Sequence, residues 1–265
     1  MKPSESYLKK CYGLIDAVEK QLPVIREVAE RFAETILAGR MVHVFGSGHS
    51  RIMVEEMWPR YGSYPGFNPM VELSLSFHHP VVGSNGQRQA MYLENVEGLA
   101  DRILRNYEFD EVDSALVVSS SGCNIVPIEM AEGFKKRGVF VVALVSELHS
   151  EVSESKREDG MKLTDFADLV LDTGAPVGDA MVRIEGMEQP VSPGSTVGGC
   201  MVVNVIKAEL AEILTEAGQP PRALAAGAVV GGERAAEIFE AAYDEHGRRM
   251  AKLFANLNRE SCDVV

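Results

Sequence analysis

The sequence predicts an α/β protein built as a three-layer αβα sandwich, in which helices cover both faces of a parallel sheet. Short apolar runs typical of buried strands recur along the chain and alternate with helical segments. Two of these runs end in turns of glycine and serine, and a helix follows each turn. The 265 residues, 46% of them apolar, are enough for one domain with a large core.

The amino-terminal region is predicted to be helical. Apolar residues at three-and-four spacing run from Leu8 to Ile36, and Pro23 is expected to interrupt or bend the helix. We expect residues 1–40 to form an N-terminal helical segment and residues 41–265 to form the domain that holds the sheet, within a single-domain chain.

Four apolar runs are predicted to be strands, and a further run is a candidate fifth strand. The four are Met41–Phe45, Ala115–Val118, Val139–Val145 and Asp168–Leu171, and the candidate is Met70–Phe77. Strands that alternate with helices form a parallel sheet, and such sheets bind ligands outside the carboxyl ends of their strands. We therefore look for a site in the loops that follow these runs.

Helices are expected after each serine turn and near the end of the chain. Glu94 is expected to start another helical stretch, through Leu104, and the polar segment 146–162 is expected to be a surface excursion. The other predicted helices run from the first serine turn to Trp58, from Pro127 to Arg137, from Thr196 to Ala217 and from Glu233 to Leu257.

The composition excludes several classes of partner. A formal charge of −13 argues against nucleic acid and anionic membrane surfaces, because basic side chains supply most of that affinity. The four cysteines form no C-x-x-C pair, which disfavours a disulfide framework or a zinc cage. The amino terminus has no basic-then-apolar leader and no run reaches ~18 apolar residues, so we expect a cytoplasmic location.

The two serine turns are predicted to bind an anion. The first contains Ser47, Gly48 and Ser50, and the second spans residues 119–124. A loop of small residues before a helix presents unpaired backbone N–H groups and the positive helix end to one point. The alternative for Ser50 alone is a helix N-cap, but two such turns after two strands favour a binding site.

Other glycine-loop cofactors do not match the spacing. A dinucleotide fingerprint would place its third glycine where Arg51 stands, and the chain has no Gly-Lys-Ser or Gly-Lys-Thr of a Walker loop. We therefore expect no NAD, no ATP and no other cofactor.

The two turns resemble those of the sugar isomerase (SIS) domain family, in its phosphoheptose isomerase-like branch. Residues 44–50 are similar to its G-x-G-x-S loop and residues 118–124 to its S-x-S-G-x-[ST/N] loop. A group of bacterial sugar isomerase domain proteins looks most similar, through residues 48–50, 126–131 and 174–180. The resemblance implies a flavodoxin-like fold with a five-stranded parallel sheet and a phosphosugar ligand. The implied phosphate-binding residues are Ser47, Gly48, Ser50, Ser119, Ser120, Ser121 and Asn124.

Aldose–ketose conversion needs a base at carbon and an acid–base group at oxygen. Glu55 and Glu56 look like the glutamate pair of the E-E-x-x-x-R-Y stretch that carries the base in phosphoheptose isomerases, and solvated helix glutamates are the alternative. Those enzymes also carry a histidine on the last long helix, which this chain lacks. Either His49, His78 or His79 replaces it, or the chemistry differs.

The remaining polar residues divide between the site and the scaffold. Glu94, Ser195 and Thr196 are candidate sugar contacts and equally candidate helix caps. His43 lies inside a predicted strand and is expected to be a core residue with its polar atoms satisfied. Asp165, Asp168, Asp172 and Asp179 cluster in sequence, and we interpret them as caps and turns rather than as a metal site, so no metal is expected.

These observations predict a cytoplasmic isomerase that interconverts an aldose and a ketose of a phosphorylated or otherwise anionic sugar. Two alternatives remain: a non-catalytic phosphosugar-binding or sensing protein, and a lyase that removes an ether substituent from an amino-sugar phosphate. The resemblance also implies a homodimer or homotetramer with active sites at the interfaces between subunits.

Overall fold

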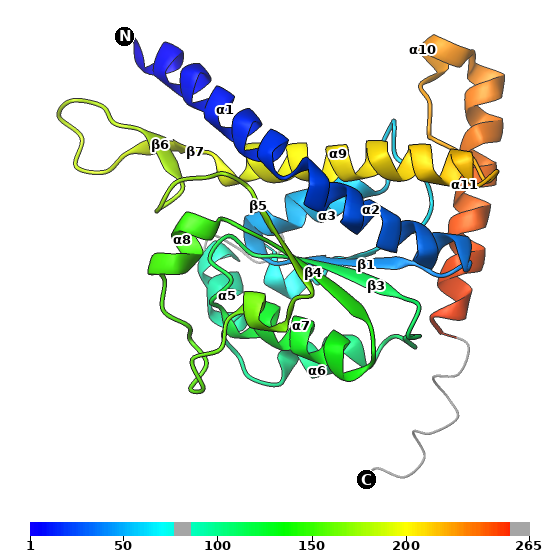
Figure 1. Cartoon of the computed structure of the whole chain (residues 1–265), viewed down its shortest axis with the longest axis horizontal. Helices are drawn as coiled ribbons and strands as arrows, with labels where there is room; N and C mark the ends of the chain where they lie inside the picture. Colours follow the sequence, from blue (N-terminus) through cyan, green and yellow to red (C-terminus); the bar gives the residue numbers. More distant parts are fainter. Residues whose placement is uncertain (77–85, 255–265) are drawn as a thin grey trace.

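A five-stranded parallel sheet forms the centre of the molecule. The computed structural model describes residues 1–76 and 86–254, and its sheet has the order β2-β1-β3-β4-β5 (Figure 1). Val42 of β1 lies opposite Phe67 on one side and Ser114 on the other, with all strands parallel. The strands are β1 (Val42–Gly46), β2 (Phe67–Met70), β3 (Ser114–Val118), β4 (Phe140–Val145) and β5 (Leu169–Asp172).

Helices cover both faces of this sheet, which confirms the predicted three-layer α/β fold. Alternate side chains of each strand enter different cores: Val42 and Val44 pack under one helical layer, and Phe45 packs under the other. Figure 1 shows the first layer above the sheet and the second below it. The first layer contains α2 (Leu22–Leu37), α3 (Arg51–Met57) and α9 (Ser195–Glu216), and the second contains α5 (Gly86–Leu93), α6 (Leu99–Leu104) and α7 (Ile125–Lys136).

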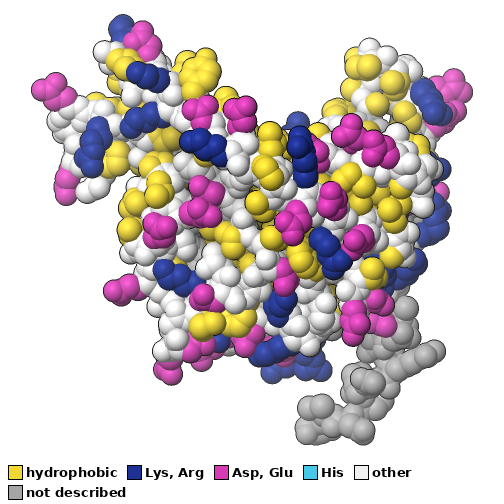
Figure 2. Space-filling model, in the orientation of Figure 1, with side chains coloured by type: hydrophobic (Ala, Val, Ile, Leu, Met, Phe, Trp, Pro, Cys, Tyr) yellow, Lys and Arg dark blue, Asp and Glu magenta, His cyan; other side chains and the backbone are white. Residues whose placement is uncertain are grey.

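Two projections extend beyond the sheet. One, which we call the amino-terminal arm, joins α1 (Pro3–Lys20) to the antiparallel hairpin of β6 (Ala180–Val182) and β7 (Val191–Pro193). The other, the carboxyl-terminal arm, is formed by α10 (Gly227–Val230) and the start of α11 (Gly232–Lys252). Figure 2 shows a hollow between the two arms, and acidic and basic side chains are interspersed on this face. Within residues 1–76 and 86–254, no helix is long and apolar enough to cross a bilayer.

The predicted interruption near Pro23 is confirmed, and Gln21 occupies it. Pro23 lies in the first turn of α2. The Gln21 side chain donates to the Asp172 carbonyl (2.7 Å) and accepts from the Asp172 N–H (2.8 Å). Because β5 is an edge strand, its unpaired backbone groups would otherwise be open to another chain. The break between α1 and α2 therefore closes part of the sheet edge.

Two predicted elements are wrong in position. The fifth strand is β2, which ends at Met70 and does not begin there. After it, the Glu72 side chain accepts from the Ser74 N–H (3.3 Å) and holds a 3₁₀ turn over Leu73–Leu75. Local side-chain capping thus overrides the alternating pattern. Phe77, at the end of the predicted run, lies outside the described residues.

The second correction concerns Glu94, which follows a helix and does not start one. Its N–H donates to the Ala90 carbonyl (3.0 Å) at the end of α5. Gly98, with φ of +77°, separates α5 from α6. The segment 146–162 also contains an unpredicted helix, α8 (Glu147–Val152). The last helix, α11, ends at Lys252, five residues before the predicted end at Leu257. Leu257 itself lies outside the described residues.

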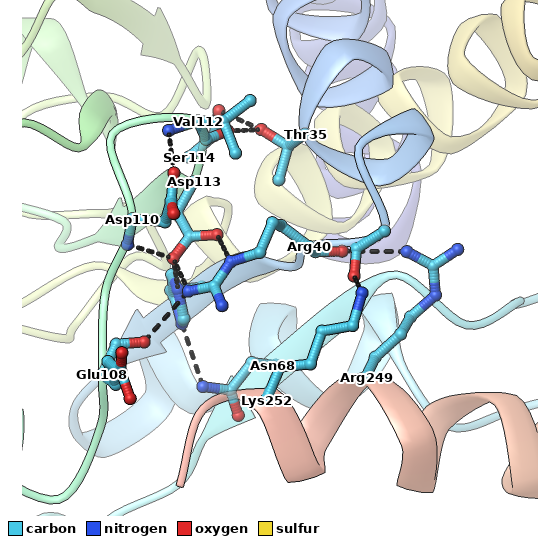
Figure 3. Close-up of polar contacts among 12 residues, drawn as sticks. Thr35, Arg40, Asn68, Glu108, Asp110, Val112, Asp113, Ser114, Arg249 and Lys252 are labelled. Carbon is cyan, nitrogen blue, oxygen red and sulfur yellow. Dashed lines mark hydrogen bonds and ion pairs between the residues drawn. The ribbon is translucent and has the colours of Figure 1, made fainter. Parts of the chain in front are cut away.

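A buried polar network lies at the end of the sheet where the strands begin (Figure 3). Asp113 is fully buried and accepts from Arg40 Nε (2.8 Å) and Nη2 (2.7 Å), from His43 Nε2 (3.3 Å) and from the Asp110 N–H (2.9 Å). Asn68 donates to His43 Nδ1 (3.0 Å), which fixes the imidazole proton on Nε2. This confirms the prediction that His43 is a satisfied core residue.

The last helix is anchored at this same end of the sheet. Arg249 of α11 donates to the carbonyls of Ile36 (3.0 Å) and Arg40 (2.9 Å), and Lys252 donates to the Gly39 carbonyl (2.9 Å). These basic residues satisfy carbonyls at and after the end of α2, where cations are favoured. Two helices far apart in sequence are thereby joined at one end of the sheet, opposite the end that carries the predicted site.

Candidate functional site

A cavity of about 370 Å³ lies at the carboxyl ends of the strands. It lies where the chain order reverses, since β1 has β2 on one side and β3 on the other. Open α/β sheets bind ligands at such switch points. Both serine turns line the cavity, and every residue predicted there for phosphate binding takes part: Ser47, Gly48, Ser50, Ser119, Ser120, Ser121 and Asn124.

The first turn bends tightly after β1. A Cβ on Gly46 would lie 2.6 Å from the Ser50 carbonyl oxygen, and Gly48 has φ of +55°, so both positions favour glycine. The Ser50 N–H donates to the Ser47 carbonyl (3.0 Å), and the Ser50 side chain makes no cap hydrogen bond. Ser50 therefore stands at the N-cap position of α3 but does not cap the helix through its side chain. His49, in the same turn, also lines the cavity.

The second turn is held by its own serines. Ser119 Oγ accepts from the Gly122 N–H (3.2 Å), and Ser121 Oγ accepts from the Cys123 N–H (3.2 Å). Gly122 has φ of +64°, which turns the chain into α7. Asn124 stands at the N-cap position of this helix without a side-chain cap bond. The turn and the helix start thus line the cavity with hydroxyls and the positive end of α7.

Glu94 brings a carboxyl group to the same cavity. It lies just after α5 and accepts from Ser47 Oγ at 2.7 Å. Burial raises the pKa of Glu94 above its usual value, although hydrogen bonds from Ser47 and Asn124 and the charge of Lys156 oppose the shift. A carboxyl group with a raised pKa is suited to accept and return a proton.

Another part of the cavity wall contains residues that the sequence did not single out for binding. His149 of α8 lines it, and its Nδ1 accepts from the Gly178 N–H (3.3 Å). His149 belongs to the segment 146–162, whose polar sequence was interpreted as a surface excursion. For that reason the sequence did not indicate a binding role for His149. Its place directly after a buried strand was the available signal, because the loops after parallel strands carry the ligand sites.

Asp179 and the start of α9 complete this wall. The Asp179 carboxylate accepts from the N–H groups of Gly194 (3.0 Å) and Ser195 (2.7 Å) and from Ser195 Oγ (2.8 Å). Ser195 and Thr196 line the cavity, while Gly194 holds the N-cap position of α9. The interpretation as caps and turns holds for Asp165, Asp172 and Asp179, which accept from backbone N–H groups of nearby turns and helix starts. Asp168 instead accepts from the Val141 N–H of the neighbouring strand and pairs with Lys135.

Glu55 and Glu56 lie elsewhere on this chain. They line an open groove of about 520 Å³ between α3 and α11, with Tyr61 and Tyr243 among its walls. Glu56 accepts from Asn204 (2.9 Å) and pairs with Arg60. Burial opposes ionisation of Glu56, but these donors and the charge of Lys207 outweigh it and lower its pKa.

The other histidines are placed as follows by the described residues. His78 and His79 lie outside the described residues. His246 of α11 packs its ring against Trp58 at a centroid distance of 5.4 Å. Among the described residues, no group of His, Cys, Asp and Glu side chains has the arrangement of a metal site.

Comparison with known proteins agrees with this geometry. A UPF0309 protein from Listeria innocua is 30% identical, over 92% of this chain and 95% of the relative. Another UPF0309 protein, from Halalkalibacterium halodurans, is 33% identical over 78% of this chain and 84% of the relative. A solved phosphoheptose isomerase from Francisella tularensis shares the fold, with a TM-score of 0.50 and 14% identity, over 78% of this chain and 95% of that one. The family model of the SIS domain matches residues 6–146, and the chain therefore belongs to the SIS domain family.

Proposed function

We propose that the cavity binds a sugar phosphate and that the protein interconverts its aldose and ketose forms. One observation carries the proposal: Glu94, a carboxyl group with a raised pKa, shares one cavity with both serine turns and bonds directly to Ser47. An anion seat and a proton acceptor within one cavity are the two requirements of this reaction.

The phosphate seat would consist of neutral donors. Serine hydroxyls at positions 47, 50, 119, 120 and 121 and the N–H groups at the start of α7 line the cavity, so no basic side chain is needed. The formal charge of −13 is therefore compatible with an anionic ligand, since these donors add nothing to that count.

Glu94 would act at carbon. Its carboxylate removes the C2 proton of the open-chain aldose, the C–H electron pair forms the C1=C2 bond, and the protonated carboxyl group then returns the proton to C1. Because Glu55 and Glu56 lie in the separate groove, they would enter this chemistry only from a neighbouring chain. Glu94 is accordingly the base that we assign within one chain.

Proton NMR in heavy water tests the proposal with a panel of sugar phosphates. We expect exchange of the C2 proton together with ketose formation. We expect Glu94→Gln to abolish exchange while sparing binding, and Glu158→Gln, an exposed glutamate outside the cavity, to behave as the wild type. Exchange with loss of a substituent would instead indicate a lyase, and binding without exchange a sensor.

The phosphate seat has its own test. Ser121→Ala removes one hydroxyl from the second turn, and hydrogen bonds to charged groups contribute roughly 1.5–3 kcal/mol. We expect the dissociation constant for inorganic phosphate or a sugar phosphate to rise about tenfold or more by calorimetry. An unchanged constant, with the variant folded, would contradict the placement of the phosphate at this turn.

A further inference from the structure

Two histidines, His49 and His149, line the cavity within the described part of the chain, at different places. His49 belongs to the first serine turn and so lies at the end that we assign to the phosphate. His149 belongs to α8, which follows β4, the strand next to β3, whereas Glu94 bonds to Ser47 of the first serine turn. A sugar whose phosphate occupies the two turns would share one cavity with both Glu94 and His149.

The His149 imidazole is held in one orientation. Its Nδ1 accepts from the Gly178 N–H, which assigns the ring proton to Nε2. The His149 carbonyl accepts from Ser153 Oγ (2.6 Å), and the adjoining residue Ser150 is buried and accepts from Lys162 Nζ (2.6 Å) at its carbonyl. The short helix is thus fixed on both sides of His149, and Nε2 carries the remaining proton.

We infer that His149 is the second acid–base group of the site and moves a proton between the two sugar oxygens. This assignment rests on the proposed function. As Glu94 removes the C2 proton, the carbonyl electron pair moves to O1, and His149 Nε2–H gives its proton to O1. Nε2 then takes the proton of O2, the O2 electron pair forms the new carbonyl at C2, and Glu94 returns its proton to C1. The imidazole ends as it began, and no co-reactant is needed.

The assignment explains how this chain can lack a histidine on its last long helix. Residues 196–204 of α9 contain none. The wall that α9 forms through Ser195 and Thr196 is shared with His149 and Asp179, so α8 would bring an imidazole to the same wall from a different element.

Two substitutions separate a role in proton transfer from a role in holding the Gly178 turn. His149→Asn keeps an acceptor near the position of Nδ1 and removes Nε2, whereas His149→Gln keeps a donor near Nε2 and removes Nδ1. Leu148→Ala, at an exposed neighbour on α8 outside the cavity lining, is the matched control. Each variant is assayed for turnover against pH, for C2 proton exchange and for sugar-phosphate binding.

We expect His149→Asn to lower turnover by roughly 100-fold or more, because positioned acid–base groups contribute about 10²–10⁴-fold. Binding should stay near the wild-type value, and Leu148→Ala should match the wild type. Near-normal turnover of His149→Asn, with damage confined to His149→Gln, would overturn the assignment and leave the proposed function intact. Absence of exchange by the wild-type protein would overturn both.

Discussion

Asp113 and His43 form a buried pair whose charges depend on their surroundings. Burial alone would keep Asp113 protonated, but hydrogen bonds from His43 and Arg40 outweigh burial and lower its pKa below the usual value. Burial lowers the pKa of His43 below its ordinary value of 6.5, although Asp113 opposes the shift. The folded state therefore holds a neutral imidazole beside a carboxylate that Arg40 neutralises.

This pair should make stability depend on pH. The unfolded chain takes up a proton at His43 near pH 6.5, before the folded chain does, so acid favours unfolding. We expect the free energy of unfolding to fall as pH drops below 6.5, by at most about 1.4 kcal/mol per pH unit for one group. Asp113 adds to the loss below its own usual value of 3.8.

Urea unfolding at several pH values measures the slope, with His43→Gln as the variant. Glutamine can still accept from Asn68 and donate to Asp113, but it does not titrate. The variant should lose less stability than the wild type between pH 6.5 and 5. Some slope should remain, because burial also lowers the pKa of His246. Equal slopes in the two proteins would rule out His43 as a source.

The cavity was predictable from sequence where its residues lie in short local patterns. Both serine turns, with Ser119 and Ser121, follow apolar strands, and the strand–turn–helix pattern needs no knowledge of distant contacts. Glu94 was predicted as a sugar contact on a helix start, and it lines the cavity from a helix end. His149 was not predicted, because its proximity to Gly178 depends on how the chain after β4 packs against the chain after β5.

At the scale of elements, close packing of α9 shapes the cavity wall. A Cβ on Gly198 would lie 1.9 Å from the Thr173 carbonyl oxygen, and one on Gly199 would lie 3.0 Å from the Met53 side chain. Helix α9 therefore approaches the chain after β5 and helix α3 more closely than any larger residue permits. Thr173, Ser195 and Thr196 line the cavity, so the position of α9 sets part of its shape.

Gly198→Ala should test this packing. We expect it to push the start of α9 away from Thr173, to cost about 1–3 kcal/mol of the free energy of unfolding, and to weaken sugar-phosphate binding. Gly247→Ala is the control, since a Cβ there meets nothing within 4 Å and alanine favours a helix by roughly 0.5–1 kcal/mol. Urea unfolding and calorimetry measure the two effects. Unchanged stability and binding of Gly198→Ala would show that α9 can shift freely.

Elements were predictable when a local signal was strong. β1, β3, β4 and β5 match their predicted runs to within a residue or so, because each consists mainly of apolar residues; β1, β3 and β4 are almost fully buried, whereas the edge strand β5 is only partly buried. β2 was misplaced since Asn68 and Pro69 interrupt its apolar pattern, although the strand pairs with β1. The β6–β7 hairpin has no comparable pattern, and contacts with α1 stabilise it: the Tyr7 hydroxyl donates to the Pro193 carbonyl (3.0 Å) and Lys10 to that of Met181.

At the scale of the whole molecule, the amino-terminal arm presents two different faces. One face of α1 packs on the hairpin, through Leu14 against Met181 and Val182. The other exposes Leu8 and Tyr12, at 63% and 68%, one helical turn apart. Exposed apolar residues grouped on a projecting helix are typical of contacts with another protein. This agrees with the homodimer or homotetramer expected from the sequence, which remains a prediction.

The double substitution Leu8→Glu and Tyr12→Glu should therefore lower the molar mass measured by light scattering, because two charges would have to be buried at the interface. Leu73→Glu, an exposed position away from the arm, should leave the mass unchanged. The dissociated protein should keep its sugar-phosphate affinity within about threefold, under ~1 kcal/mol, because Glu94, His149 and both serine turns lie around one cavity of a single chain. It should also keep turnover, since Glu94 and His149 come from the same chain.

Lost binding would contradict a single-chain cavity. Binding without turnover would show that a neighbouring chain supplies a reacting group, and Glu55 and Glu56, which line the groove beside the carboxyl-terminal arm, would then be the first residues to substitute.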